Sequence, residues 1–212
     1  MPRSLSRLFA LSSVLFLVVL AISPAKNFFR PYRSLQTRYR RLGEERAKSL
    51  KAAEQYAARP VAIQQIWLRD FDNRVDRCTT CHLGAADPLM QGAPEPFRIH
   101  PKTAHAPDDF DRFGCTACHG GQGLSTSEEE AHGTAPEAGP PMTPLPYIEA
   151  GCGRCHAGVT VAEAPILSHG RALMARFGCY ACHAVRGQEV FRSEAPPLMT
   201  IALKTGGVWL KR

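Results

Sequence analysis

The chain of 212 residues is long enough for one or two domains, and its 17 prolines and 17 glycines indicate a loop-rich fold. The formal charge of +7 arises entirely near the N-terminus. Residues 1–70 hold 13 Lys and Arg against 4 Asp and Glu, whereas residues 71–212 hold 13 against 15. Because basic residues are not interleaved with aromatic ones around the cysteines, the composition argues against nucleic-acid binding.

Residues 1–25 have the pattern of an export signal or membrane anchor. Arg3 and Arg7 precede a run, residues 8–22, that is apolar apart from two serines. Small residues at 23–25 suit a signal peptidase, whereas the aromatic and basic segment at 26–30 is typical of a retained anchor. We favour a retained single-pass anchor, and the pattern leaves cleavage open.

Residues 26–60 form the next segment, and residues 30–58 are predicted to be one helix that ends before Pro60. A partial apolar stripe includes Tyr32, Leu35 and Tyr39. Two interpretations remain open for this segment. It is either a solvated stalk or a docking surface for a membrane partner or anionic headgroups, which its arginines would bind.

The remaining chain carries one motif four times. The pattern C-x-x-C-H is the attachment signature of c-type haem, since two thiols reach the two vinyl groups of one porphyrin and the adjacent histidine reaches the iron. The cysteines and proximal histidines are Cys78, Cys81 and His82, then Cys115, Cys118 and His119, then Cys152, Cys155 and His156, then Cys179, Cys182 and His183.

Two other interpretations of paired cysteines are a zinc ribbon and a disulfide framework. Neither explains why a histidine follows every second cysteine, so the pattern favours four covalently bound haem c groups. The motifs begin 37, 37 and 27 residues apart, and such short intervals predict closely spaced cofactors. C-type haems are attached outside the cytoplasm, in agreement with an export signal.

The four histidines outside the motifs are candidates for the second axial ligands. His100, His105 and His132 lie in predicted loops and are the favoured iron ligands. His169 opens a predicted helix over residues 168–177 and is a weaker candidate. Methionine is the alternative ligand, and the available methionines are Met90, Met142, Met174 and Met199.

Residues 165–212 resemble the first half of a class I monohaem cytochrome c. The resemblance is carried by Phe177-Gly178-Cys179, by Pro196-Pro197-Leu198 and by Val208-Trp209-Leu210. In that family the methionine ligand comes later, in a loop before a C-terminal helix. The resemblance therefore implies an incomplete module and leaves the sixth ligand of the fourth haem open, because Met199 comes too early.

Residues 60–160 resemble a family of membrane-anchored multihaem c-type cytochromes. The segments that carry this resemblance are residues 75–84, VDRCTTCHLG, and residues 113–123, FGCTACHGGQG. Members occur with bacterial respiratory complexes, often beside quinol-oxidising subunits of the cytochrome b type. The resemblance implies such a membrane partner, and a periplasmic cytochrome or terminal reductase as the acceptor.

Together these observations predict a mainly α multihaem cytochrome c with extensive irregular loops, organised by covalent haems. The expected parts are an anchor or signal (1–25), a helical stalk (26–60), a three-haem domain (61–160) and a partial class I-like module (161–212). The expected function is electron transfer from a quinol-oxidising partner to a periplasmic acceptor, at the inner membrane. The alternative is a multihaem reductase with one open haem iron, whereas a haem sensor lacks any accompanying signalling domain.

Overall fold

The computed structural model describes residues 3–71, 73–103, 105, 109–185, 195–198 and 201. Met199 and residues 208–210, on which two of the sequence predictions depend, lie outside the described residues. The structure is mainly helical with few strands, which confirms the predicted class. Its α-helices and strands are α1 (Arg3–Ile22), α2 (Pro31–Arg46), α3 (Leu50–Ala57), β1 (Ile66–Leu68), β2 (Arg74–Asp76), α4 (Phe110–Phe113), α5 (Thr116–His119), α6 (Glu128–Ala131) and α7 (Pro165–Arg176).

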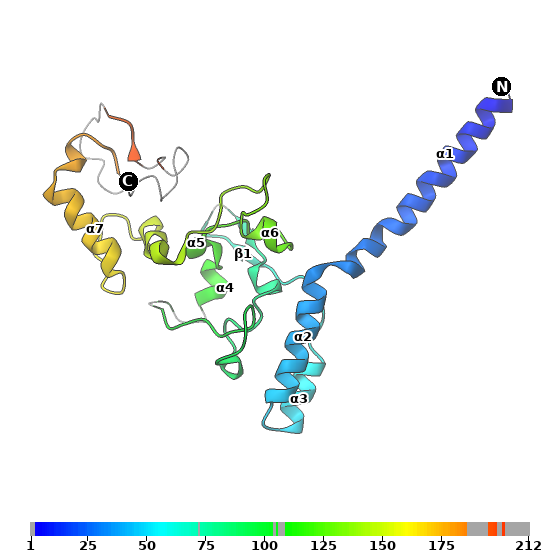
Figure 1. The fold of residues 1–212 in the computed structure, drawn as a ribbon, viewed down its shortest axis with the longest axis horizontal. Coiled ribbons are helices and arrows are strands. Elements are labelled where there is room, and N and C mark those ends of the chain that lie inside the picture. The colour runs from blue at the N-terminus through cyan, green and yellow to red at the C-terminus, as the bar shows by residue number, and fades with distance from the viewer. Residues whose placement is uncertain are drawn as a thin grey trace.

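Helix α1 projects from one end of the molecule as an isolated rod (Figure 1). Its apolar side chains are exposed along its length, and Phe28 and Phe29 just beyond it are 70 % and 85 % exposed. The helix is long and apolar enough to cross a membrane, a property that signal sequences share. The side of the membrane on which the rest of the chain lies stays a prediction.

The single helix predicted over residues 30–58 is wrong, because α2 and α3 are two helices that pack side by side as a hairpin (Figure 1). Helix α2 ends at Arg46, and the Ser49 side chain accepts a hydrogen bond from Ala52 N (3.2 Å) to begin α3. Gly43 faces the ring of Tyr56, and a Cβ at this position would overlap that ring. The glycine therefore allows the two helices to approach each other closely.

One face of the hairpin is buried against the segment that follows the first motif, so α2 is not a solvated stalk. Tyr39 and Tyr56 form a hydrophobic core with Met90, Ala93 and Phe97. Both tyrosine hydroxyls donate to one carboxylate oxygen of Asp87, at 2.5 and 2.6 Å. The hairpin is thus attached to the rest of the chain by its own apolar stripe, a role that neither interpretation of the sequence included.

The hairpin also contacts the first C-x-x-C-H motif directly. The Gln36 side chain, 1 % exposed on α2, donates to the carbonyl of Thr80 at 2.9 Å. Thr80 is itself fully buried, and its hydroxyl donates to Gln64 O at 2.8 Å. Helix α2 and the segment after α3 therefore hold the first motif from two sides.

Strands β1 and β2 form a two-stranded antiparallel sheet in which Ile66 pairs with Asp76. The turn between them packs against α4, where Phe71 and Phe113 meet edge to face. This small sheet places the end of β2 between the first motif, which follows it in the chain, and the second motif, which follows α4.

Candidate cofactor sites

All four C-x-x-C-H motifs adopt the same local structure, a single helical turn. In each, the histidine N–H donates to the carbonyl of the first cysteine at 2.9 Å. The turn brings two thiols and one imidazole to the same short stretch of backbone, as attachment to one porphyrin requires. All eight cysteines are free thiols, so the alternative of a disulfide framework has no support in the structure.

Three motif histidines lie ring to ring with a histidine from elsewhere in the chain. His82 is paired with His132, with ring centroids 6.2 Å apart and planes at 46°. His119 and His100 are 5.9 Å apart at 78°. His156 and His105 form the third pair, with ring centroids 6.2 Å apart and planes at 27°.

These separations fit two imidazoles bound to one iron from opposite sides. A metal–nitrogen bond of about 2.0 Å on each side, with about 1.1 Å from nitrogen to ring centre, puts the two centroids about 6 Å apart. The buried Nδ1 of His119 has no hydrogen-bond partner among the described residues.

Of the three histidines that face a motif histidine, two are oriented by a contact to Nδ1, which leaves Nε2 available. His100 Nδ1 lies 2.8 Å from the carbonyl of Pro101, and His105 Nδ1 lies 3.6 Å from Asp109 Oδ2. His132 follows α6 as its C-cap residue. Such contacts fix the ring orientation of metal-bound histidines in proteins.

The charge state of two motif histidines also suits metal binding. Burial, followed by the neighbouring His132, lowers the pKa of His82 below its ordinary value. Burial, followed by His100, lowers the pKa of His119 in the same way. Both rings are therefore neutral at neutral pH, and a neutral imidazole carries the lone pair that a metal ion needs.

The fourth site differs from the other three. His183 Nδ1 lies 2.9 Å from the carbonyl of Pro196, a contact that directs Nε2 away from this loop. Among the described residues no ring contact joins His183 to another histidine, and His169 is exposed on α7. Of the methionine candidates, Met90 is fully buried in the α2–α3 core and Met199 lies outside the described residues.

Side chains of one site hold the backbone of the next. Arg154, inside the third motif, donates to the carbonyls of Thr116 and Ala117 in the second, at 3.1 and 3.2 Å. Arg171 on α7 donates to His156 O in the third motif at 2.6 Å, and α7 leads into the fourth motif. The sites thus follow one another in space in chain order, away from α1 (Figure 1).

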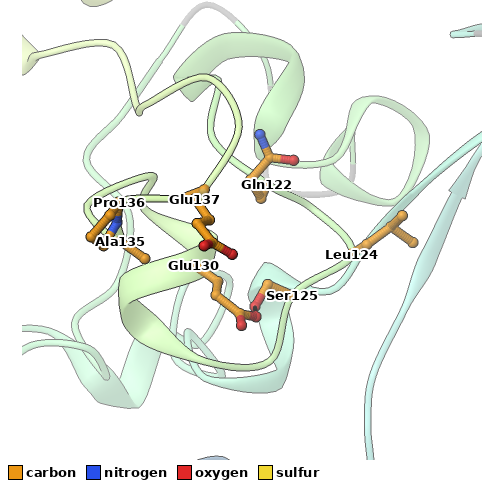
Figure 2. A pocket seen from close by; sticks show the side chains of 8 residues that line it. Gln122, Leu124, Ser125, Glu130, Ala135, Pro136 and Glu137 are labelled. Carbon is orange, nitrogen blue, oxygen red and sulfur yellow. Dashed lines mark hydrogen bonds between the residues drawn. The ribbon is translucent and has the colours of Figure 1, made fainter.

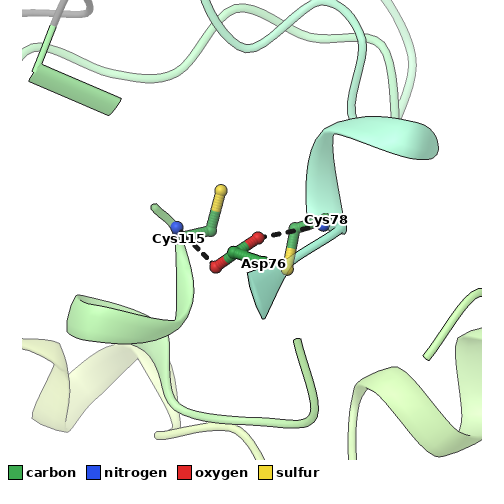
Figure 3. Close-up of side chains that lie close together, drawn as sticks. All are labelled: Asp76, Cys78 and Cys115. Carbon is green, nitrogen blue, oxygen red and sulfur yellow. Dashed lines mark hydrogen bonds between the residues drawn. The ribbon is translucent and has the colours of Figure 1, made fainter. Parts of the chain in front are cut away.

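One group of possible metal ligands also lies at the junction of the first two motifs. Ligand atoms of Asp76, Cys78 and Cys115 are within 4.8 Å of one another (Figure 3). A hydrogen bond with Cys115, followed by burial, raises the pKa of the Cys78 thiol, which disfavours the thiolate that zinc binds. A zinc ribbon needs four converging ligands, and this group of described residues offers three.

A cavity of about 690 Å³ lies elsewhere, beside α6, which carries its lining residue Glu130 (Figure 2). Gln122, Ser125, Glu130 and Glu137 are among the residues that line it. No cysteine or histidine is among its described lining residues, so it is not one of the candidate sites.

No protein-family model, curated protein or solved structure matches the chain. Sequence reasoning did not identify Asp76 or Arg154 as residues that connect motifs. The available signals were an acid two residues before Cys78 and an arginine inside the third C-x-x-C-H. Without the fold, neither residue indicates a contact between two motifs.

Proposed function

We propose that this protein transfers electrons through four covalently attached c-type haems. The observation that supports the proposal best is the set of three histidine pairs, each of which combines one motif histidine with one other at about the separation of two ligands on one iron. When bound, haem iron supplies one-electron redox chemistry, and its surroundings tune the potential.

The residues of the chain have distinct roles in this proposal. The eight cysteines tether the haems, and His82, His119, His156 and His183 are the proximal ligands. His132, His100 and His105 complete the coordination of the first, second and third irons respectively. Six-coordinate iron has no open position for a substrate, which favours a carrier over a reductase.

We further propose that the haem region lies on the periplasmic side of the inner membrane, held there by α1. A quinol-oxidising membrane subunit of the cytochrome b type would supply the electrons, and a periplasmic cytochrome or terminal reductase would accept them. The apolar α1 and the exposed Phe28 and Phe29 beside it support the membrane location. The serial order of the four sites supports a path that leads away from that membrane.

The pairing is tested by electron paramagnetic resonance of the oxidised, haem-loaded protein. The angle between two axial ring planes sets the orbital splitting of low-spin iron, so the 78° pair should give the most anisotropic signal and the 27° pair the least. His100→Ala should remove the former and His105→Ala the latter, each with a gain of high-spin iron. The control His169→Ala, at an exposed histidine, should leave all signals unchanged.

Two results would contradict this function. The first is a purified chain that carries no covalently bound haem after expression with a haem-attachment system. The second is a pair of variants, His100→Ala and His105→Ala, whose low-spin signals match those of the unsubstituted protein.

A reductase with one open iron is the second candidate, favoured by one observation. Among the described residues His183 has no histidine opposite it. Carbon monoxide binding to the reduced protein separates the two functions, because a haem iron with an open position binds it and a six-coordinate iron does not.

A further inference from the structure

Asp76 is a fully buried carboxylate at the junction of the first two motifs. It is the last residue of β2 and precedes Cys78 by two positions. Among the described residues no lysine or arginine forms an ion pair with Asp76. Three backbone N–H groups donate hydrogen bonds to its carboxylate.

Each oxygen of this carboxylate binds a different motif. Oδ1 accepts from Cys78 N at 3.0 Å, within the first motif. Oδ2 accepts from Cys115 N at 2.9 Å, within the second motif (Figure 3). It also accepts from Thr116 N at 2.8 Å, within the same motif. One side chain therefore connects two C-x-x-C-H turns that lie 37 residues apart in the sequence.

The second loop is shaped to approach this carboxylate. Gly114, at φ +64°, immediately precedes Cys115, and a Cβ there would lie 2.8 Å from Asp76 Oδ2. On the other side of the loop, Arg77 N donates to Gly123 O at 2.8 Å. The loop is thus attached to β2 and the residue after it at both of its ends.

The carboxylate remains charged although it is buried. Burial opposes ionisation, but the hydrogen bonds from Thr116 and Cys78 outweigh it and hold the pKa of Asp76 below its ordinary value. The negative charge also acts on His119, where it opposes the lowering of the pKa by burial. A buried charge is screened weakly by solvent, so its effect on nearby groups is large.

We propose that Asp76 is a positioning residue shared by the first and second haem sites, which holds both attachment loops together and keeps the reduction potentials of both haems low. The inference rests on the proposed function. A fixed negative charge stabilises the oxidised iron, which carries one more positive charge than the reduced iron. The third and fourth sites have no contact with this carboxylate among the described residues.

The test is a redox titration of the haem-loaded, full-length Asp76→Asn variant, followed by optical and paramagnetic resonance spectra. Two of the four midpoint potentials should rise, those of the 46° and 78° histidine pairs, while the other two stay unchanged. Asp70→Asn is the matched control, because Asp70 is an exposed carboxylate paired with Arg112 (3.2 Å) on the adjacent turn. It should leave all four potentials unchanged.

Asparagine cannot accept all three hydrogen bonds, so the haem occupancy of the variant is measured as well, by mass spectrometry of the haem-bearing peptides. Joint loss at the first and second motifs, with the third and fourth occupied, supports the shared role. Loss at the first motif alone contradicts it. Unchanged potentials in a variant with four haems also contradict it, whereas an unsubstituted protein without haem contradicts the proposed function itself.

Discussion

The first three motifs and the fourth are built differently. The first three share residues with one another: Asp76 spans the first and second, Arg154 spans the second and third, and each motif histidine faces a histidine from another segment. The fourth motif follows α7 and makes its described ring-nitrogen contact with Pro196, within its own loop.

The difference shows two ways in which a short chain can form such sites. Where motifs are 37 residues apart, the intervening chain is too short for separate cores, so neighbouring motifs share hydrogen bonds and histidine contacts. The histidine contacts are consequently crossed in the sequence, since His132 comes after the second motif yet lies ring to ring with His82 of the first. The fourth motif instead contacts its own helix α7 and its own loop.

The largest expected effect comes from removal of a haem within the connected region. Substitution of Cys115 and Cys118 by serine should abolish attachment at the second motif and reduce occupancy at the first and third, which pack against it. The same change at Cys179 and Cys182 should remove one haem and leave the other three occupied. Haem counting by absorbance and intact mass makes the comparison.

Equal effects of the two double substitutions would contradict the contrast between the connected sites and the fourth. A loss confined to the second motif would show that the three sites assemble independently.

A smaller contrast concerns two glycines within helices. Gly43 lies on α2, which packs against the first motif, and Gly170 lies on α7, which precedes the fourth. Gly43→Ala should destabilise the protein by about 1–3 kcal/mol, because the added methyl overlaps the Tyr56 ring in a packed interface. Gly170→Ala on α7 is the control, since a Cβ there meets nothing within 4 Å, and should stabilise α7 by about 0.5–1 kcal/mol. Denaturant unfolding followed by circular dichroism measures both, and destabilisation by Gly170→Ala would contradict the open environment of α7.

The smallest expected effect is a loss of folding stability at alkaline pH that arises in the α2–α3 hairpin. Burial, followed by the hydrogen bond to Asp87, raises the pKa of Tyr56 from 10.0 to about 12, and the same causes raise that of Tyr39 further. Because the folded-state pKa is raised, the stabilisation is complete below pH 10 and is lost as the pH rises above it.

Tyr56→Phe should reduce the loss of stability above pH 10, whereas the control Tyr180→Phe, inside the fourth motif and away from Asp87, should not. Thermal unfolding at a series of pH values measures the effect, which should be about 1 kcal/mol for one such hydrogen bond. A Tyr56→Phe profile that coincides with that of the unsubstituted protein would contradict the role of the Asp87 contact.

Local patterns in the sequence predicted the local structure well. The apolar run at residues 8–22 predicted α1, whereas the helical turn at each C-x-x-C-H was not predicted. The helix over residues 168–177 was predicted close to its place, although Pro165 allows α7 to begin three residues earlier. The break between α2 and α3 was missed because residues 46–50 contain no glycine or proline, and only the serine cap at Ser49 indicates it.

Contacts between distant segments were beyond the reach of the sequence. His100, His105 and His132 were selected as ligands from their loop surroundings, but nothing local indicates which motif each one faces. That assignment depends on how the loops fold back around β2 and α5. The role of Asp76 could not be predicted for the same reason. An aspartate two residues before a cysteine is ordinary in sequence, and its role depends on the second motif's loop, which lies against it in the fold.

The most direct test of the central claim is carbon monoxide binding to the dithionite-reduced, haem-loaded protein. We predict that carbon monoxide binds at most one haem per chain, at the fourth motif, because the proposed coordination gives the first three irons a histidine on both sides, from the three ring pairs. No binding would mean a closed fourth site and a pure electron carrier, whereas binding at the fourth motif alone would favour the reductase. Binding to two or more haems would contradict the three histidine pairs on which the account depends.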